Sequence, residues 1–176
     1  TGSEATAHAI RLSRGYTGRD HIILSLGGYN EWHNEVARKV MTTIEEVGTR
    51  ISPGEYEFLA MSSGIPEDTK KKVHIVNYND LESVEYVMKK YPVACVMTEP
   101  VLQNAGIIPP KPGYLKGLVD LCEKHGSVCI FDEVKTGFRT GLGGYQEYCG
   151  VKPHLSVFGK AVANGYPLGV IGGKQE

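Results

Sequence analysis

The sequence lacks both a long apolar run and a marked excess of one charge. Its 176 residues include 19 Lys and Arg and 20 Asp and Glu, for a formal net charge of -1. That balance provides no strong field to attract nucleic acid or an anionic membrane surface. No apolar stretch approaches the length of a membrane span, and there is no charged-then-apolar secretory signal. We therefore expect a cytoplasmic protein with no nucleic-acid partner and no membrane partner.

Cysteine and several catalytic motifs are also scarce or missing. The four cysteines form no C-x-x-C pair, and three lie in apolar segments, which favours reduced, buried thiols. The chain has no G-x-x-x-x-G-K-[ST] phosphate loop, no H-E-x-x-H zinc motif and no G-x-S-x-G nucleophile elbow. These absences argue against a P-loop nucleotide hydrolase, a zinc protease and a serine hydrolase. We predict no metal site.

What the chain does contain is a regular alternation of strand-like and helix-like segments. Hydrophobic residues make up 41 % of it and charged residues 22 %, as in ordinary globular domains. Short apolar runs predict strands at 21–26, 73–76, 93–97, 128–131, 155–158 and 167–173. Such an alternation indicates an α/β fold of three layers, with a mostly parallel sheet flanked by helices.

Helical periodicity fills the spaces between most of these strands. A helix is predicted from Ser3 with Gly15 as its cap, a second from the cap Asn79 to Tyr91, and a third over 115–122 that Gly126 ends. The range 35–47 is also predicted as a helix, whereas 48–72 is expected to be irregular. Because the capping pattern Thr1-x-x-Glu4 already opens a helix at the first residue, we interpret the chain as part of a longer protein.

Polar residues gather where the predicted strands end. They are Glu99, Asp132 with Glu133, Lys160, and the turn Gly28-Tyr29-Asn30. In open parallel sheets, ligands bind beyond the carboxyl ends of the strands. The grouping therefore predicts a functional site at that edge of the sheet.

Asp132 has three interpretations from the sequence alone. It directly follows four apolar residues, where a carboxylate is costly unless a donor or cation meets it. It would cap the amides of the next loop, bind magnesium beside a nucleotide, or pair with a protonated cofactor ring nitrogen. The missing phosphate loop weighs against the second of these.

Two further features have a structural and a functional interpretation each. Lys160 follows an apolar strand, so its ammonium either reaches out to water or lies in a pocket that yields the neutral amine of a Schiff base. Gly2 and Ser3 either cap the first helix or present its free amides and a hydroxyl to a phosphate. The glycine-rich run 141–144 lacks the context of a dinucleotide loop and is interpreted as a flexible loop.

Over almost its whole length the chain resembles class III aminotransferases, and among them most closely the glutamate-1-semialdehyde aminomutase branch. The resemblance rests on an ordered set of motifs: Thr1-Gly2-Ser3-Glu4-Ala5, Gly28-Tyr29 with Trp32-His33, Glu99-Pro100-Val101, FDEVKTGFR from Phe131 to Arg139, Gly143-Gly144, Gln146, Gly150-Val151 with Pro153, Phe158-Gly159-Lys160, and GYPLG from Gly165 to Gly169.

The resemblance implies a pyridoxal-phosphate enzyme of fold type I. Residues 1–176 would then form part of its large, cofactor-binding domain, with an N-terminal segment and a C-terminal small domain absent. The implied activity is transfer of an amino group, by transamination or an aminomutase reaction, on a small amino acid, amino aldehyde or amine. Proteins of this kind are homodimers with the active site at the subunit interface, so we expect the isolated chain to have little or no activity. A non-catalytic module of the same fold is the alternative.

Individual roles carry over onto the matching positions. Gly2 and Ser3 match the phosphate-binding turn, and Tyr29 matches the aromatic residue that stacks on the pyridine ring. Val134 is similar to the residue that packs on the ring's other face.

The remaining roles concern the reacting groups. Asp132 matches the partner of the ring nitrogen, and Lys160 matches the Schiff-base lysine. Glu99 and Asn104 occupy positions that line the cofactor site in similar proteins.

The chain departs from the family pattern at four positions. Asn30 and Glu31 follow Tyr29 where the branch usually has His and Gly, Lys135 replaces an uncharged residue, and His154 replaces a common aspartate. The acidic Glu31 is expected to change the cofactor pocket or the choice of substrate.

Overall fold

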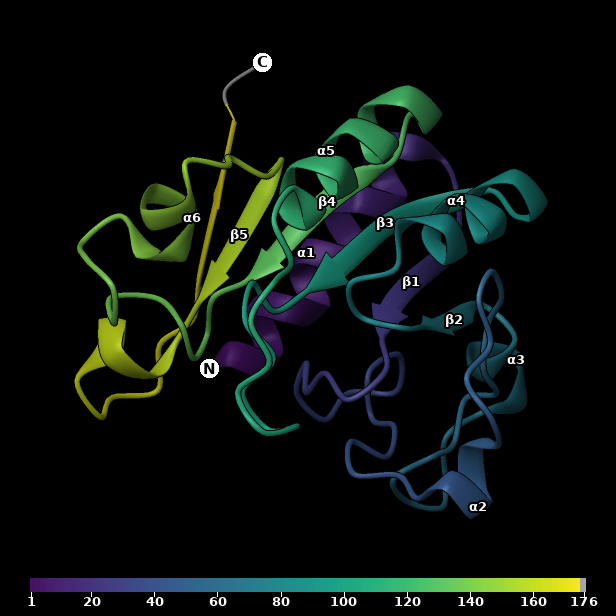
Figure 1. The fold of residues 1–176 in the computed structure, drawn as a ribbon. Coiled ribbons are helices and arrows are strands. Elements are labelled where there is room, and N and C mark those ends of the chain that lie inside the picture. The colour runs from purple at the N-terminus through teal and green to yellow at the C-terminus, as the bar shows by residue number, and fades with distance from the viewer. Residues whose placement is uncertain (175–176) are drawn as a thin grey trace.

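The computed structural model describes residues 1–174, and six strands in them form a single sheet (Figure 1). The strand order is β2-β1-β3-β4-β5-β6. Their bounds are β1 His21–Ser25, β2 Val73–Val76, β3 Val93–Thr98, β4 Val128–Asp132, β5 Leu155–Phe158 and β6 Val170–Gly173. The first five strands pair in parallel, and β6 pairs antiparallel to β5. The predicted mostly parallel sheet is confirmed.

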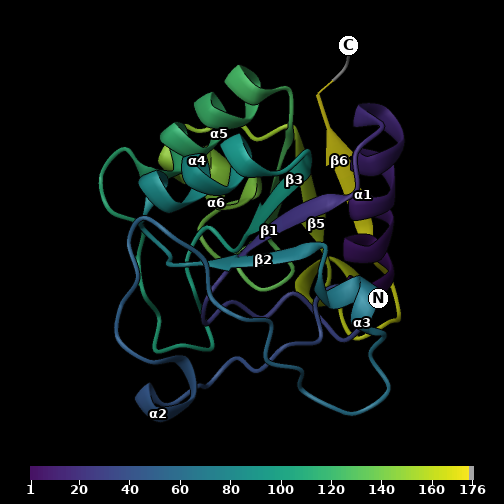
Figure 2. The ribbon, with the colours of Figure 1, turned by 90° about the vertical axis from the view of Figure 1, so that its right-hand side faces the viewer.

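Helices cover both faces of the sheet. Helix α1, Gly2–Thr17, lies on one face, while α4, Leu81–Lys90, and α5, Tyr114–His125, lie on the other (Figure 2). The short helices are α2 Ile44–Val47, α3 Glu67–Lys70, α6 Gly144–Cys149 and the 3-10 helix η1 Lys160–Ala163. This is the three-layer arrangement expected from the sequence.

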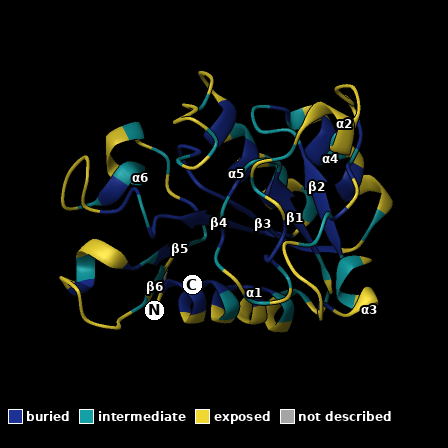
Figure 3. Cartoon of the chain, turned by 90° about the horizontal axis from the view of Figure 1, so that it is seen from below, coloured by how far each residue is buried: buried dark blue, intermediate teal, exposed yellow. Residues whose placement is uncertain are grey.

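The central strands are apolar throughout because both of their faces are buried. Ile22 and Leu24 on β1 pack toward α1, whereas Ile23 packs toward α4 and α5. Seen from below, the buried strands lie between the two helical layers, whose outer sides are exposed (Figure 3). Full burial of one such side chain contributes about 1.5–3 kcal/mol, so these strands anchor the edge at which they end.

The structure corrects the predicted end of α1 and the predicted helix at 35–47. Gly15 lies inside α1, and Gly18 at φ 65° caps it instead. Within 35–47 only α2 is helical. The reason is that Arg38 is buried in irregular backbone, where it forms an isolated antiparallel bridge with Ala60. Burial and long-range pairing therefore outweigh helical propensity there.

Two smaller boundaries also differ from prediction. The cap of α4 is Asp80, whose carboxylate accepts a hydrogen bond from the amide of Ser83 at 3.1 Å. Asn79, the predicted cap, instead has φ 63° and accepts a bond from the amide of Lys111, so it joins two loops. Strand β6 begins at Val170 rather than at 167.

Asp80→Ala should lower the free energy of unfolding by about 1–2 kcal/mol, because an orphan amide of the first turn of α4 loses its acceptor. Urea denaturation measures the loss. Asp80→Asn keeps an acceptor and should cost far less. An equal loss in both variants would mean that the charge of Asp80, and not its capping bond, stabilises the helix.

Candidate active site

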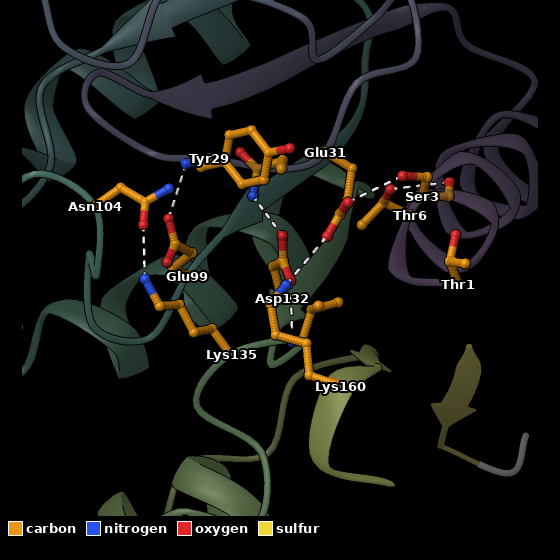
Figure 4. Close-up of polar contacts among 12 residues, drawn as sticks. Thr1, Ser3, Thr6, Tyr29, Glu31, Glu99, Asn104, Asp132, Lys135 and Lys160 are labelled. Atoms are coloured by element: carbon orange, nitrogen blue, oxygen red, sulfur yellow. Dashed lines mark hydrogen bonds and ion pairs between the residues drawn. The ribbon is translucent and has the colours of Figure 1, made fainter. Parts of the chain in front are cut away.

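The carboxyl ends of β1, β3, β4 and β5 meet at one edge of the sheet, and the first turn of α1 lies at the same edge (Figure 1). Parallel pairing produces this convergence, because neighbouring parallel strands end on the same side. The predicted site residues therefore come together from distant parts of the chain (Figure 4).

Asp132, at the end of β4, is the most deeply placed acid of the site, with 3 % of its surface exposed. One carboxylate oxygen accepts a bond from the side-chain amide of Asn30 at 2.7 Å, and the other accepts one from the backbone amide of Val134 at 3.1 Å. Burial raises the pKa of Asp132 to about 7, and the neighbouring charge of Glu99 adds to the rise, while the bond from Asn30 opposes it.

Behind Asp132, Asn30 connects the carboxylate to a buried arginine. The Arg38 guanidinium donates to the Asn30 side-chain oxygen at 3.2 Å and to the carbonyl of Ser25 at 2.8 Å. These bonds orient the Asn30 amide so that its N–H group points at Asp132. Burial lowers the pKa of Arg38 to about 10, against the attraction of Glu99 and Asp132. Arg38 was missed from the sequence because its burial and its bonds to Ser25 and Asn30 depend on contacts that no local motif indicates.

Glu99 fixes the turn that carries Tyr29. Its carboxylate accepts from the amide of Tyr29 at 2.8 Å and from the amide of Gln103 at 3.2 Å, and burial raises its pKa. Asn104 lies further out, exposed, and its side-chain oxygen accepts from the Lys135 ammonium at 2.6 Å. Glu99 is therefore a structural support of the site, whereas Asn104 and Lys135 form a contact at its rim (Figure 4).

The first turn of α1 already holds an anion supplied by the chain itself. The hydroxyl of Ser3 donates to the carboxylate of Glu31 at 2.9 Å. Glu31 has φ 84°, a conformation rare in residues with a side chain. A Cβ added to Gly2 would lie 2.7 Å from that carboxylate and 2.8 Å from a methyl of Val134, so the bare glycine permits this close approach.

Lys160 opens η1 directly after β5, also at a positive φ of 48°. Its side chain is 49 % exposed, and its ammonium lies 3.8 Å from the Glu31 carboxylate. A Cβ on the preceding Gly159 would meet both Val134 and the backbone of Gly2. The Lys160 turn and the first turn of α1 are therefore in direct contact, and Glu31 lies between their polar groups.

Glu133, although next to Asp132, belongs to the scaffold. It is fully buried and accepts from the amides of Tyr145 and Gln146 and from the hydroxyl of Thr136. It thus caps the start of α6. Across residues 1–174, no three His, Cys, Asp or Glu side chains are grouped so as to hold a metal ion. In the same residues, no helix combines the length and apolarity needed to cross a membrane.

The fold and the site define a three-layer α/β domain with an acid, an amine and a helix N-terminus at one sheet edge, and comparisons with known proteins identify its relatives. The family model described as "Aminotransferase class-III" matches residues 1–176, so the chain belongs to the class III aminotransferase family. It is 42 % identical over 178 residues to glutamate-1-semialdehyde 2,1-aminomutase 1 of Bacillus cereus (strain G9842), covering 100 % of this chain and 39 % of that protein.

Solved structures agree in fold. An omega-transaminase from Sphaerobacter thermophilus superimposes with a TM-score of 0.89 at 29 % identity, over 99 % of this chain and 39 % of that one. A variant glutamate-1-semialdehyde aminomutase from Pseudomonas aeruginosa PAO1, in complex with PMP, gives a TM-score of 0.80 at 30 % identity, over 99 % and 37 % of the two chains. The chain thus spans about 39 % of the length of the curated relative.

These comparisons confirm the predicted family, its likeness to the aminomutase branch and the fold-type expectation. Class III aminotransferases use pyridoxal phosphate, so the predicted cofactor is confirmed for the family. The roles assigned to individual residues stay predictions.

Asp132→Asn should change how stability depends on pH. Because burial raises the pKa of Asp132 from 3.8 to about 7, the folded protein retains a proton that the unfolded chain releases. The wild-type protein therefore loses stability as pH rises through this window, and the uncharged variant does not. The variant's free energy of unfolding, relative to wild type, should rise by about 2–4 kcal/mol between pH 4 and pH 8.

Urea denaturation of the cofactor-free proteins at several pH values measures this difference. If the free energies of unfolding of wild type and variant change in parallel with pH, Asp132 titrates as an ordinary aspartate. That result would contradict the raised pKa that burial without a bonded cation gives Asp132.

Proposed function

We propose that the chain is part of the cofactor-binding large domain of a pyridoxal-phosphate enzyme that transfers amino groups, with Lys160 as its Schiff-base lysine. The observation that supports this most is the juxtaposition at one sheet edge of a buried, unneutralised Asp132 with the half-exposed amine of Lys160. Membership of the class III family supports the same reading.

The residues present fit the cofactor. Asp132 accepts its hydrogen bonds from neutral donors among the described residues, and the nearby Arg38 guanidinium bonds to Asn30 and Ser25 instead, so no cation is bonded to the carboxylate. A protonated ring nitrogen would supply one. Gly2, at the start of α1, lies directly against Glu31 and Val134, since a Cβ there would meet both, so the helix N-terminus adjoins the Asp132 loop. Tyr29, half-buried in the same edge, offers an aromatic face.

When bound, pyridoxal phosphate supplies an aldehyde that condenses with amines and a ring that accepts electrons from the substrate carbon. Asp132 would hold a proton on the ring nitrogen, which would favour that electron flow. Its carboxylate is held for this purpose by the Asn30 amide and the Val134 amide.

Lys160 has two tasks in this scheme. Its Nζ would hold the cofactor covalently, and when free as a neutral amine it would take the proton from the substrate carbon and hand it on to the carbon of the former aldehyde group. Half exposure of the side chain leaves it the freedom to move between these positions. The amides at the start of α1 and the Ser3 hydroxyl would hold the phosphate.

We further propose a small amino acid, amino aldehyde or amine as substrate, and a homodimer as the working form of the whole protein. Likeness to named aminomutases and transaminases supports the substrate class. Large apolar side chains close in sequence to the site residues are exposed, as expected for a surface that a second subunit covers: Trp32, Phe138 and Tyr166.

A non-catalytic module of the same fold is the second candidate. It would bind the cofactor without converting it. Adding amino donors to the protein with bound pyridoxal phosphate distinguishes the two candidates. An aminotransferase or aminomutase converts the cofactor to its amine form, and a binding module does not.

Lys160→Ala should abolish covalent attachment of pyridoxal phosphate. The whole protein as the gene encodes it is mixed with the cofactor, its visible absorbance is recorded, and it is then reduced with borohydride and mapped by mass spectrometry. We expect a visible band and a reduced adduct on Lys160 in the wild type, and neither in the variant.

Lys135→Ala is the matched control, because it removes a second amine from the same edge of the sheet. It should keep the adduct on Lys160. An adduct on Lys135, or a band that survives in Lys160→Ala, would refute the assignment of the Schiff-base lysine.

A further inference from the structure

Glu31 combines a strained backbone with a carboxylate at the start of α1. It has a positive φ of 84°, which costs free energy in any residue with a side chain. Its carboxylate nevertheless reaches the first turn of α1, where it accepts the hydroxyl proton of Ser3 at 2.9 Å. It also lies 3.8 Å from the ammonium of Lys160. The strained backbone of Glu31 thus places a carboxylate between Ser3, the proposed phosphate donor, and Lys160, the proposed Schiff-base lysine.

The consequence is competition between two anions. The first turn of α1 offers the positive end of the helix dipole. Thr1 and Glu4 already cap one another there in a capping box, and the Ser3 hydroxyl donates to Glu31. A phosphate entering that turn needs the same hydroxyl and meets the carboxylate at close range. Two like charges a few ångströms apart repel strongly when partly buried. Either Glu31 leaves the turn or the phosphate binds weakly.

We propose that Glu31 is a specificity-determining residue of the phosphate turn: it holds the Ser3 hydroxyl, so that a phosphorylated ligand binds only by displacing the carboxylate. The proposal rests on the proposed function, since it concerns how this chain receives pyridoxal phosphate. It predicts that Glu31 weakens the binding of pyridoxal phosphate without weakening the binding of pyridoxal, which has the same aldehyde and ring but no phosphate.

The test compares both aldehydes on the whole protein and on its Glu31→Gln and Glu31→Gly variants. Dissociation constants are taken from the visible absorbance that marks attachment to Lys160. Glu31→Gln removes the charge alone, whereas Glu31→Gly removes the charge and the backbone strain. We expect both variants to bind pyridoxal phosphate at least about tenfold more tightly than wild type, with the preference over pyridoxal raised by the same factor.

The ratio of the two aldehydes separates this effect from others. Loss of the contact with Lys160 would change the reactivity of its amine toward both aldehydes alike, and relief of backbone strain would also act on both. Glu57→Gln is the control, because it removes the same charge from an exposed residue outside the site. It should leave the ratio of the two dissociation constants unchanged. Thermal unfolding of each variant checks that it is folded.

Each result decides the matter. An unchanged ratio in both variants, or weaker binding of pyridoxal phosphate, overturns the proposal while leaving the proposed function intact. A gain confined to Glu31→Gly and equal for both aldehydes assigns the effect to strain and also overturns it. If no protein, wild type included, attaches either aldehyde, the proposed function fails and this proposal fails with it.

Discussion

The Asp132 carboxylate is buried at the end of β4, and in the described residues it accepts hydrogen bonds from two neutral N–H donors. A charge in such a place is unfavourable unless a cation meets it, and burial accordingly raises its pKa to about 7. The Arg38 guanidinium is near, but its hydrogen bonds to the site go to Asn30 and to the carbonyl of Ser25. The protein thus orients the carboxylate without bonding a cation to it, which fits the proposed pairing of Asp132 with a protonated ring nitrogen.

The rest of the domain serves to hold that carboxylate in place. Parallel pairing of β1, β3, β4 and β5 brings their ends together, and apolar packing on both faces makes the edge rigid. Glu99 accepts the amide of Tyr29 and so holds the Tyr29 turn at this edge. Glu133 accepts the amide of Tyr145 and so caps α6. All three buried acids accept backbone amides, and Asp132 is the one among them that is proposed to pair with the ring nitrogen of the cofactor.

Much of the fold was predictable because it depends on local patterns. Apolar runs located the strands, and Gly126 ended α5 where expected. The position of Asp132, Lys160 and Ser3 at one sheet edge was predictable, because these polar residues lie at the ends of apolar strands or at the start of a helix. Arg38 and the irregular course of 35–47 were not, because long-range burial decides them and no local pattern records it. Glu31 was visible as a departure from the family pattern, but its bond to Ser3 depends on a turn that only the folded chain brings near α1.

The most direct test of this account is the titration of the Asp132 carboxyl carbon by ¹³C NMR, with Asp132→Asn to assign its signal. In the cofactor-free protein the account predicts titration near pH 7, far above the ordinary value of 3.8. After pyridoxal phosphate is added, the signal should stay that of an ionised carboxylate well below that pH, because the ring nitrogen supplies the missing cation. A carboxyl that titrates near 4 without cofactor, or whose titration the cofactor does not move, would contradict it.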